Sequence, residues 1–214
     1  NNPTGAFTEK NKMDQLAKGL KKFPHVAILS DEIYSRQIYD QKKMPTFFNY
    51  PDLYDRLIVL DGWSKAYSMT GWRLGWSVWP EQFVEHINKF CTNNHSCVNA
   101  AVQFGGIAAL DGPDDFIIMV MKEFTERRKI IFEGLNNIKG IECSLPGGGF
   151  YAFPKVPNHL KLTATEFVKK CVADNLLVIQ GSVFSSRDTH FRLSFAVSND
   201  ILSQGLEKLK HLMR

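Results

Sequence analysis

The sequence has few of the features that mark several large classes of protein. It has four cysteines, and none forms a Cys-x-x-Cys pair or has a histidine nearby at the spacing of a zinc site. The formal net charge is only +4 and the lysines are scattered, which argues against nucleic acid as a partner. No apolar run approaches the ~20 residues that span a bilayer, and these residues contain no signal-peptide pattern and no internal repeat. We therefore expect reduced thiols, no metal site and no membrane partner.

The first residues, Asn-Asn-Pro-Thr-Gly, are typical of a turn rather than of the start of a fold. We therefore expect the chain to be the C-terminal portion of a longer protein. The expected location is cytoplasmic, with organellar targeting left open because upstream residues could carry a targeting segment. With 44% hydrophobic and 22% charged residues, the composition is that of a globular protein with a sizeable core.

Two short apolar runs end in polar residues. Residues 26–29 and 57–60 are each typical of a strand that is buried on both faces of a sheet. Ser-Asp-Glu follows the first run, and Asp-Gly-Trp-Ser-Lys follows the second. Because ligands of open α/β sheets bind at the carboxyl ends of the strands, these polar residues are candidates for a site. A third strand over 73–79 follows too soon for a helical crossover, so we expect it to be antiparallel.

The remaining pattern predicts helices and short strands up to the C-terminus. Thr8 is the expected N-cap of a first helix that ends before Pro24. An apolar helix is expected from about Ser96, and a long amphipathic helix from Asp114. The last part is expected to be a small α+β domain. Its expected strands lie around 141–144, 149–153, 178 and 190–195, and its expected helices cover about 163–175 and begin again at 200.

Seven residues in these segments are candidates for a site, namely Asn2, Asp31, Tyr34, Ser64, Lys65, Arg73 and Arg192. Taken singly, most have an ordinary structural interpretation: Asn2 as a turn residue, Asp31 as a helix cap, Lys65 as a surface lysine. Arg192 is less ordinary, because it stands between apolar residues of a strand and a half-buried guanidinium needs a partner. Their combination favours a shared function.

Five motifs occur in order along the chain: NNPTG, DEIY, SKAYSMTGWRLG, PGGGFYAF and FRLSFA. Together they resemble the class I and II aminotransferases, which are pyridoxal-phosphate (PLP) enzymes of fold type I, and most of all the aspartate-aminotransferase-like branch. The resemblance covers the whole chain. It implies an α/β fold in which residues 1–112 are the C-terminal half of the large, mostly parallel-sheet PLP-binding domain. Residues 113–214 would then be the interdomain helix and a small α+β C-terminal domain.

The resemblance implies how four of the residues would hold and use the cofactor ring. Lys65 would form the aldimine with PLP and later shuttle the substrate proton. Asp31 would face the pyridine nitrogen and keep it protonated, which makes the ring an electron sink. Asn2 and Tyr34 would hydrogen-bond the phenolate oxygen of the ring.

The resemblance likewise implies the groups that bind anions. Arg73 would hold the cofactor phosphate with the help of the Ser64 hydroxyl, and Arg192 would grip the substrate α-carboxylate in a two-point fork. Many relatives carry a serine three positions before the lysine, where this chain has Gly62. The ring-stacking aromatic and the rest of the phosphate site would lie upstream, and a further tyrosine would come from the partner subunit of a homodimer.

The reaction implied is amino transfer between an amino acid, aspartate-like or other, and a 2-oxo acid such as 2-oxoglutarate. Two alternatives share the constellation: a carbon–sulfur lyase or aminocyclopropane-carboxylate-synthase-like enzyme, and a non-catalytic PLP-binding module of a transcription regulator. A lyase would release its product without a second substrate. A regulator would carry a helix-turn-helix upstream.

Overall fold

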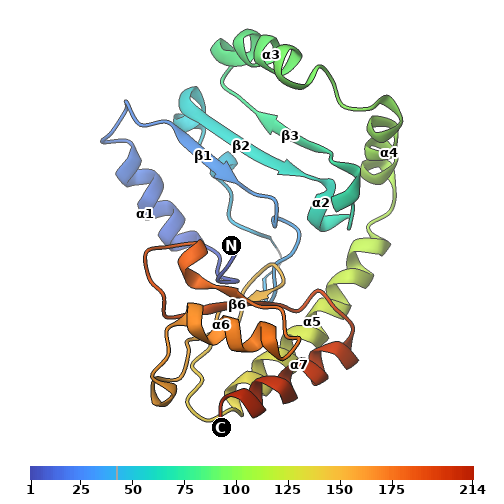
Figure 1. Ribbon diagram of the computed structural model, residues 1–214. Coiled ribbons are helices and arrows are strands. Elements are labelled where there is room, and N and C mark those ends of the chain that lie inside the picture. The colour runs from blue at the N-terminus through green and yellow to red at the C-terminus, as the bar shows by residue number, and fades with distance from the viewer. Residues whose placement is uncertain (42) are drawn as a thin grey trace. The chain divides into compact units, whose positions relative to one another are not determined.

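The computed structural model describes residues 1–41 and 43–214, and the chain divides into two compact units. Unit 1 comprises Asn1–Phe7 and Met119–Arg214, and unit 2 comprises Thr8–Ile118. Figure 1 labels the helices α1 to α7 and the strands β1, β2, β3 and β6. The mixed α/β character expected from the sequence is confirmed. The domain boundary expected after residue 112 refers to the whole protein and stays a prediction.

A three-stranded mixed sheet forms the centre of unit 2 (Figure 1). β1 (Ile28–Asp31) is parallel to β2 (Leu57–Gly62), and β2 is antiparallel to β3 (Gly75–Val78). The antiparallel direction of the third strand is thus confirmed. β1 begins two residues later than expected, and Leu29 within it is 64% exposed while Val26 before it is also exposed. In unit 2 taken by itself, one face of this strand is thus exposed, and its burial on both faces in the whole protein stays a prediction.

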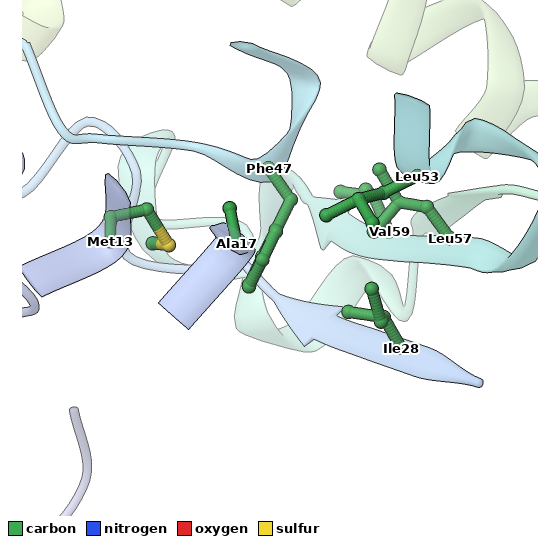
Figure 2. Packing of buried hydrophobic residues seen from close by; sticks show 7 residues of the cluster. All are labelled: Met13, Ala17, Ile28, Phe47, Leu53, Leu57 and Val59. Carbon is green, nitrogen blue, oxygen red and sulfur yellow. The ribbon is translucent and has the colours of Figure 1, made fainter. Parts of the chain in front are cut away.

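The core of unit 2 lies between the sheet and α1 (Lys10–Leu20). Met13 and Ala17 lie one turn apart on α1, so they share the face that packs inward. They join a buried cluster, shown in Figure 2, whose other members are Ile28, Phe47, Leu53, Leu57 and Val59. The N-cap residue of α1 is Glu9 rather than the expected Thr8.

Three further helices complete unit 2: α2 (Trp63–Ala66), α3 (Glu81–His95) and α4 (Ala100–Asp111). α4 begins later than the expected Ser96, because the Asn99 side chain accepts hydrogen bonds from the backbone N–H groups of the first turn and thereby caps the helix. The sequence pattern did not predict α3. All residues of α3 are exposed or partly exposed in unit 2, so its apolar residues pack against no core there.

Unit 1 is a small antiparallel sheet covered by helices. The strand order is β4 (Tyr151–Ala152), β6 (Phe191–Ser194), β5 (Ile179–Gln180). The helices are α5 (Asp115–Asn136), whose first residues belong to unit 2, α6 (Ala164–Ala173) and α7 (Asn199–Leu212). Residues 141–144 contribute only an isolated bridge between Glu142 and Lys155, so the strand expected there is wrong. The fully buried side chains include Phe167, Phe191, Phe195, Leu135 and Leu209.

Candidate active site

The carboxyl ends of β1 and β2 bring several candidate residues to one edge of the sheet. Asp31 is the last residue of β1 and lies beside Leu60 of β2. Ser64 and Lys65 belong to α2, the one-turn helix that begins directly after β2. Because β3 is antiparallel to β2, β3 begins where β2 ends, and Arg73, two residues before β3, lies at this same edge. The structure therefore brings Asp31, Ser64, Lys65 and Arg73 to one edge of the sheet, as the sequence predicted.

Gly62 occupies the position where the resemblance led us to look for a phosphate-binding serine. A Cβ atom at Gly62 would lie 2.8 Å from the Cα of Gly75 and 2.9 Å from the carbonyl oxygen of Leu74. Real side chains do not tolerate so close an approach to backbone, so β2 and β3 can meet in this way only around a glycine. In this chain, packing at this position excludes a serine.

The Arg73 backbone is left-handed, with φ 55° and ψ 44°. For a residue other than glycine this conformation costs on the order of 1–3 kcal/mol, and such strain is concentrated at ligand sites. The guanidinium donates to the carbonyl oxygen of Thr70 through Nη1 at 2.9 Å, and the side chain is otherwise exposed. The short turn thus presents a cation with donors left over for an anion.

Two successive acids at the end of β1 have opposite environments. Glu32 is 7% exposed, and its Oε1 accepts from Ser30 Oγ and Thr46 Oγ1 at 3.0 and 2.8 Å. Asp31 is exposed, and its Oδ1 accepts from the backbone N–H of Ile33 at 3.1 Å. Glu32 therefore ties the strand to the loop before the buried Phe47, whereas Asp31 presents its carboxylate at the surface of the sheet edge.

Three residues that the sequence analysis did not single out connect the segment after β1 to the segment that carries Lys65. Ser35 Oγ donates to Asp61 Oδ2 at 2.8 Å, Arg36 Nη1 donates to Tyr67 Oη at 2.9 Å, and Gln37 Nε2 donates to the Lys65 carbonyl oxygen at 3.0 Å. They follow Tyr34 directly in the chain. Polar residues after a strand are ordinary in sequence, so no pattern could have marked them.

Asp61 lies at the centre of this connection. Its Oδ1 also accepts from the backbone N–H of Gly62 at 2.6 Å. Burial raises the pKa of the Asp61 carboxyl, the negative charges of Glu32 and Asp31 add to the rise, and the two hydrogen bonds oppose it. The Asp61 carboxylate therefore links the segment after β1 to the end of β2, in surroundings whose burial and negative charge disfavour its ionised form.

In unit 1, Arg192 on β6 contacts Asn2. Its Nη1 donates to Asn2 Oδ1 at 2.7 Å, across 190 residues of chain. The guanidinium lies 4.6 Å from the ring centroid of Tyr151 and 5.1 Å from that of Phe184. Cations are attracted to ring faces at these distances, so the two aromatic rings restrict the orientation of the Arg192 guanidinium. Tyr151 belongs to the PGGGFYAF motif, but neither aromatic was singled out from the sequence.

The turn at the N-terminus is bound to the glycine-rich motif. The carbonyl oxygen of Gly5 accepts from the backbone N–H groups of Gly147 and Gly148 at 2.8 and 2.9 Å. Gly5 has φ +69°, and a Cβ there would lie 2.5 Å from the Tyr151 carbonyl oxygen. This packing places Asn2 next to Arg192, whereas Tyr34 and the other candidates belong to unit 2. Asn2 and Arg192 thus belong to unit 1, and the other five candidate residues belong to unit 2.

The residues at the sheet edge of unit 2 have the chemistry to bind PLP. An amine can bond an aldehyde, a carboxylate suits a protonated ring nitrogen, and a guanidinium with a hydroxyl suits a phosphate. Lys65, Asp31, Arg73 and Ser64 supply these groups in that order. Among residues 1–41 and 43–214, no group of three or more His, Cys, Asp or Glu side chains could hold a metal ion, and none of the helices has the length and apolar character needed to span a bilayer.

Comparison with curated proteins points to one family. The family model described as aminotransferase class I and II matches residues 1–209. A probable aspartate/prephenate aminotransferase of Rhizobium leguminosarum bv. phaseoli is 32% identical over 98% of this chain and 55% of its own length. An aspartate aminotransferase of Sulfurisphaera tokodaii is 34% identical over 99% of this chain and 54% of its own length. The chain thus spans about half the length of the curated relatives it matches.

Solved structures agree with this assignment. The aspartate aminotransferase of Rhizobium meliloti matches with a TM-score of 0.92 and 32% identity, over 99% of this chain and 56% of that one. The aromatic aminotransferase of Pyrococcus horikoshii matches with a TM-score of 0.93 and 28% identity, over 99% of this chain and 57% of that one. These neighbours have the PLP fold type I, which confirms the expected fold class. The chain therefore belongs to the class I and II aminotransferases, a family of PLP-dependent enzymes.

Proposed function

We propose that the protein to which this chain belongs is a PLP-dependent aminotransferase that moves an amino group between an amino acid and a 2-oxo acid. One observation carries the proposal. Lys65 lies on a one-turn helix directly after β2, and Asp31 ends the neighbouring parallel strand at the same edge of the sheet. Family membership supports the same assignment.

When bound, PLP supplies an electron sink that stabilises negative charge at the α-carbon of the amino acid. Lys65 Nζ would hold PLP covalently, and as a free amine it would move the proton that leaves the substrate α-carbon. Asp31 would keep a proton on the ring nitrogen, because an adjacent carboxylate favours the charged ring. Tyr34 would donate a hydrogen bond to the phenolate oxygen of the PLP ring, and Arg73 and Ser64 would bind the phosphate.

Arg192 is proposed to bind the α-carboxylate of the substrate. A guanidinium offers two parallel N–H donors. Here the rings of Tyr151 and Phe184 restrict the directions from which a carboxylate can reach these donors. Asn2 accepts from Nη1 and so holds one end of the fork. A carboxylate fixed at two points has one orientation, which aligns the bond to be broken. Asn2 is proposed to contact the phenolate oxygen of the cofactor as well.

The relatives' names guide the choice of substrates to test. They include aspartate, aspartate/prephenate, aromatic and alanine aminotransferases, so the family's scaffold serves several side chains. We propose an aspartate-like amino acid as the donor and 2-oxoglutarate as the acceptor. All of these substrates share the α-carboxylate that Arg192 is proposed to bind.

The protein is also proposed to be a homodimer with shared active sites. α4 exposes Phe104, Ile107 and Leu110, an apolar surface of the kind that contacts between polypeptides cover. Analytical ultracentrifugation of the full-length protein checks this proposal, with a dimer expected at micromolar concentration. A monomer at that concentration would contradict it.

The proposed activity is tested on the full-length protein loaded with PLP. Borohydride reduction followed by peptide mass analysis should find the cofactor on Lys65. Aspartate alone should yield at most one equivalent of its 2-oxo acid per site, and continued turnover should need added 2-oxoglutarate. Many turnovers of an amino acid without any 2-oxo acid would favour the lyase alternative. Trapped cofactor with no turnover of any amino acid would favour the binding module.

A further inference from the structure

Gln37 is a deeply buried polar residue in unit 2, with 1% of its surface exposed. Its Nε2 donates to the backbone carbonyl oxygen of Lys65 at 3.0 Å. Its Oε1 is buried and has no hydrogen-bond partner among the residues that the structure describes. The amide group therefore makes one directed bond, and that bond ends on the residue proposed to hold the cofactor.

Stability alone does not account for an amide at this position. A buried acceptor without a partner costs about 1–3 kcal/mol, whereas an apolar side chain of the same size avoids that cost. Turning the amide over would place Oε1 against the Lys65 oxygen, and two acceptors do not bond. The amide thus provides a hydrogen bond to Lys65, which an apolar residue at position 37 could not make.

The Lys65 turn needs such external support. α2 is four residues long, and so short a helix does not hold itself together, because its few internal bonds do not offset the entropy of ordering. Its first residue, Trp63, donates from Nε1 to the carbonyl oxygen of Gly106 in α4 at 2.9 Å. Gln37 holds the turn at Lys65 itself. It reaches there from the segment that begins at Asp31, so it links two groups of the proposed site.

We propose that Gln37 is a positioning residue that sets the orientation of the Lys65 amine relative to Asp31. The inference rests on the proposed function. In the step it serves, Lys65 Nζ attacks the aldehyde carbon of PLP, a C=N bond forms, and the aldehyde oxygen leaves as water after taking up two protons from the amine. Gln37 touches neither cofactor nor substrate in this step. It acts through the backbone of Lys65.

The test compares Gln37→Met and Gln37→Glu with the wild type in the full-length protein. Methionine keeps the size and removes the polar group, and glutamate keeps the shape and removes the N–H donors. Gln103→Met is the control for loss of the same kind of bond: Gln103 is exposed on α4, and its Nε2 donates to the carbonyl oxygen of Val98, just before that helix, at 2.7 Å. Three quantities are measured. The first is the rate at which cofactor-free protein captures added PLP on Lys65, followed by borohydride trapping at successive times. The others are the affinity for pyridoxine 5′-phosphate and the thermal unfolding midpoint.

Pyridoxine 5′-phosphate lacks the aldehyde, so it reports binding of the ring and phosphate without the covalent bond. We expect both Gln37 variants to capture PLP about 10- to 100-fold more slowly, since small displacements of a reacting group have effects of this order. The affinity for pyridoxine 5′-phosphate should change less than about twofold, and Gln37→Met should unfold no earlier than the wild type, because it removes the unpaired oxygen. Gln103→Met should match the wild type in all three measurements.

Unchanged capture in both Gln37 variants, with Lys65 labelled in the wild type, would overturn this inference and leave the proposed function standing. A parallel loss of capture, pyridoxine 5′-phosphate affinity and thermal stability would also overturn it, since it would show a structural role. Failure of both variants to fold counts the same way. Absence of any trapped PLP on wild-type Lys65 would overturn the proposed function, and this inference with it.

Discussion

The two units bury their apolar side chains to very different degrees. In unit 1, Phe167, Phe191 and Phe195 are completely buried. In unit 2, all four residues of β3 are exposed, and Phe104 on α4 is 73% exposed. Exposed apolar surface of this extent is typical of regions that other polypeptide covers. The comparison suggests that unit 1 has a closed core, whereas unit 2 offers surface for contacts with more of the protein.

The two groups of candidate site residues differ in how far apart their members lie along the chain. In unit 2 they lie close in sequence, at the ends of adjacent strands, and side chains such as Ser35 and Gln37 connect them. In unit 1 the pair Asn2 and Arg192 is formed by residues 190 positions apart. The first group depends on local backbone geometry, and the second depends on the packing of the N-terminal turn against the rest of unit 1.

The largest effect is expected at Lys65. Replacing Lys65 with alanine should abolish borohydride-trapped PLP in the full-length protein, because a covalent bond to the aldehyde needs this one amine. Peptide mass analysis after reduction gives the measurement, and Lys18→Ala, on an exposed turn of α1, is the control that should keep the adduct on Lys65. An adduct on another lysine in the Lys65→Ala protein would show that the strand-end geometry of unit 2 has been misassigned.

The contrast in burial predicts a second large effect. Phe191→Ala should destabilise the protein by about 3–5 kcal/mol, because it opens a cavity in the closed core of unit 1. Phe104→Ala removes a side chain that is 73% exposed in unit 2 but lies on the α4 face proposed to contact other polypeptide, so it should cost more than about 0.5 kcal/mol in the full-length protein. Denaturant unfolding of both variants measures the difference. A cost below about 0.5 kcal/mol for Phe104→Ala would show that the α4 face stays open in the full-length protein and would contradict its proposed use as a contact surface.

The sequence predicted the site in unit 2 better than the site in unit 1, and the reason is physical. Strand ends follow from local apolar runs, so Asp31, Lys65 and Arg73 could be placed at one edge from their positions in the chain. The contact of Asn2 with Arg192 depends on how distant segments pack, and no local period encodes it. From the resemblance, Asn2 was expected to contact the cofactor ring; its bond to Arg192 comes from the structure alone.

Errors in the predicted elements have similar causes. α3 was missed although its apolar residues, among them Phe83, Ile87 and Phe90, recur at helical spacing, so the sequence did carry the signal for this helix. The start of α4 was placed too early because Asn99, rather than the apolar run alone, decides where the helix begins. The strand expected at 141–144 is reduced to a single bridge, in which Glu142 pairs with Lys155.

A smaller effect is expected at the unit 1 pair. Arg192→Ala should lower kcat/KM for amino-acid and 2-oxo-acid substrates alike by about 10²-fold, equivalent to about 2.7 kcal/mol, while the PLP content stays unchanged. Arg192→Lys should recover only part of the activity, since an ammonium cannot make the two-point contact. Steady-state kinetics and cofactor absorbance are the measurements. Loss of PLP from the Arg192→Ala protein would place this arginine with the phosphate-binding groups of unit 2.

The smallest effect is expected from a helix cap in unit 1. Thr163 caps α6: its Oγ1 accepts from the backbone N–H of Glu166, and the Glu166 side chain accepts from the backbone N–H of Thr163. Thr163→Ala should cost about 1 kcal/mol in the free energy of unfolding, because the first-turn donor loses its partner. Denaturant unfolding at neutral pH measures this cost. Ser203→Ala is the control, because Ser203 lies inside α7, where its hydroxyl bonds a carbonyl of the same helix and caps no helix end.

The same cap predicts a pH dependence whose sign can be worked out. The hydrogen bonds from Thr163 lower the pKa of Glu166 in the folded state. A lowered pKa stabilises the folded protein fully above the unfolded value, about 4.3, and this contribution is lost as the pH falls through the folded value. Glu166→Gln keeps an acceptor oxygen for the cap but cannot titrate. Its unfolding free energy should therefore fall less steeply than that of the wild type between about pH 5 and pH 3. Parallel curves for the two proteins would mean that the closed core of unit 1, and not this cap, determines the acid stability of α6.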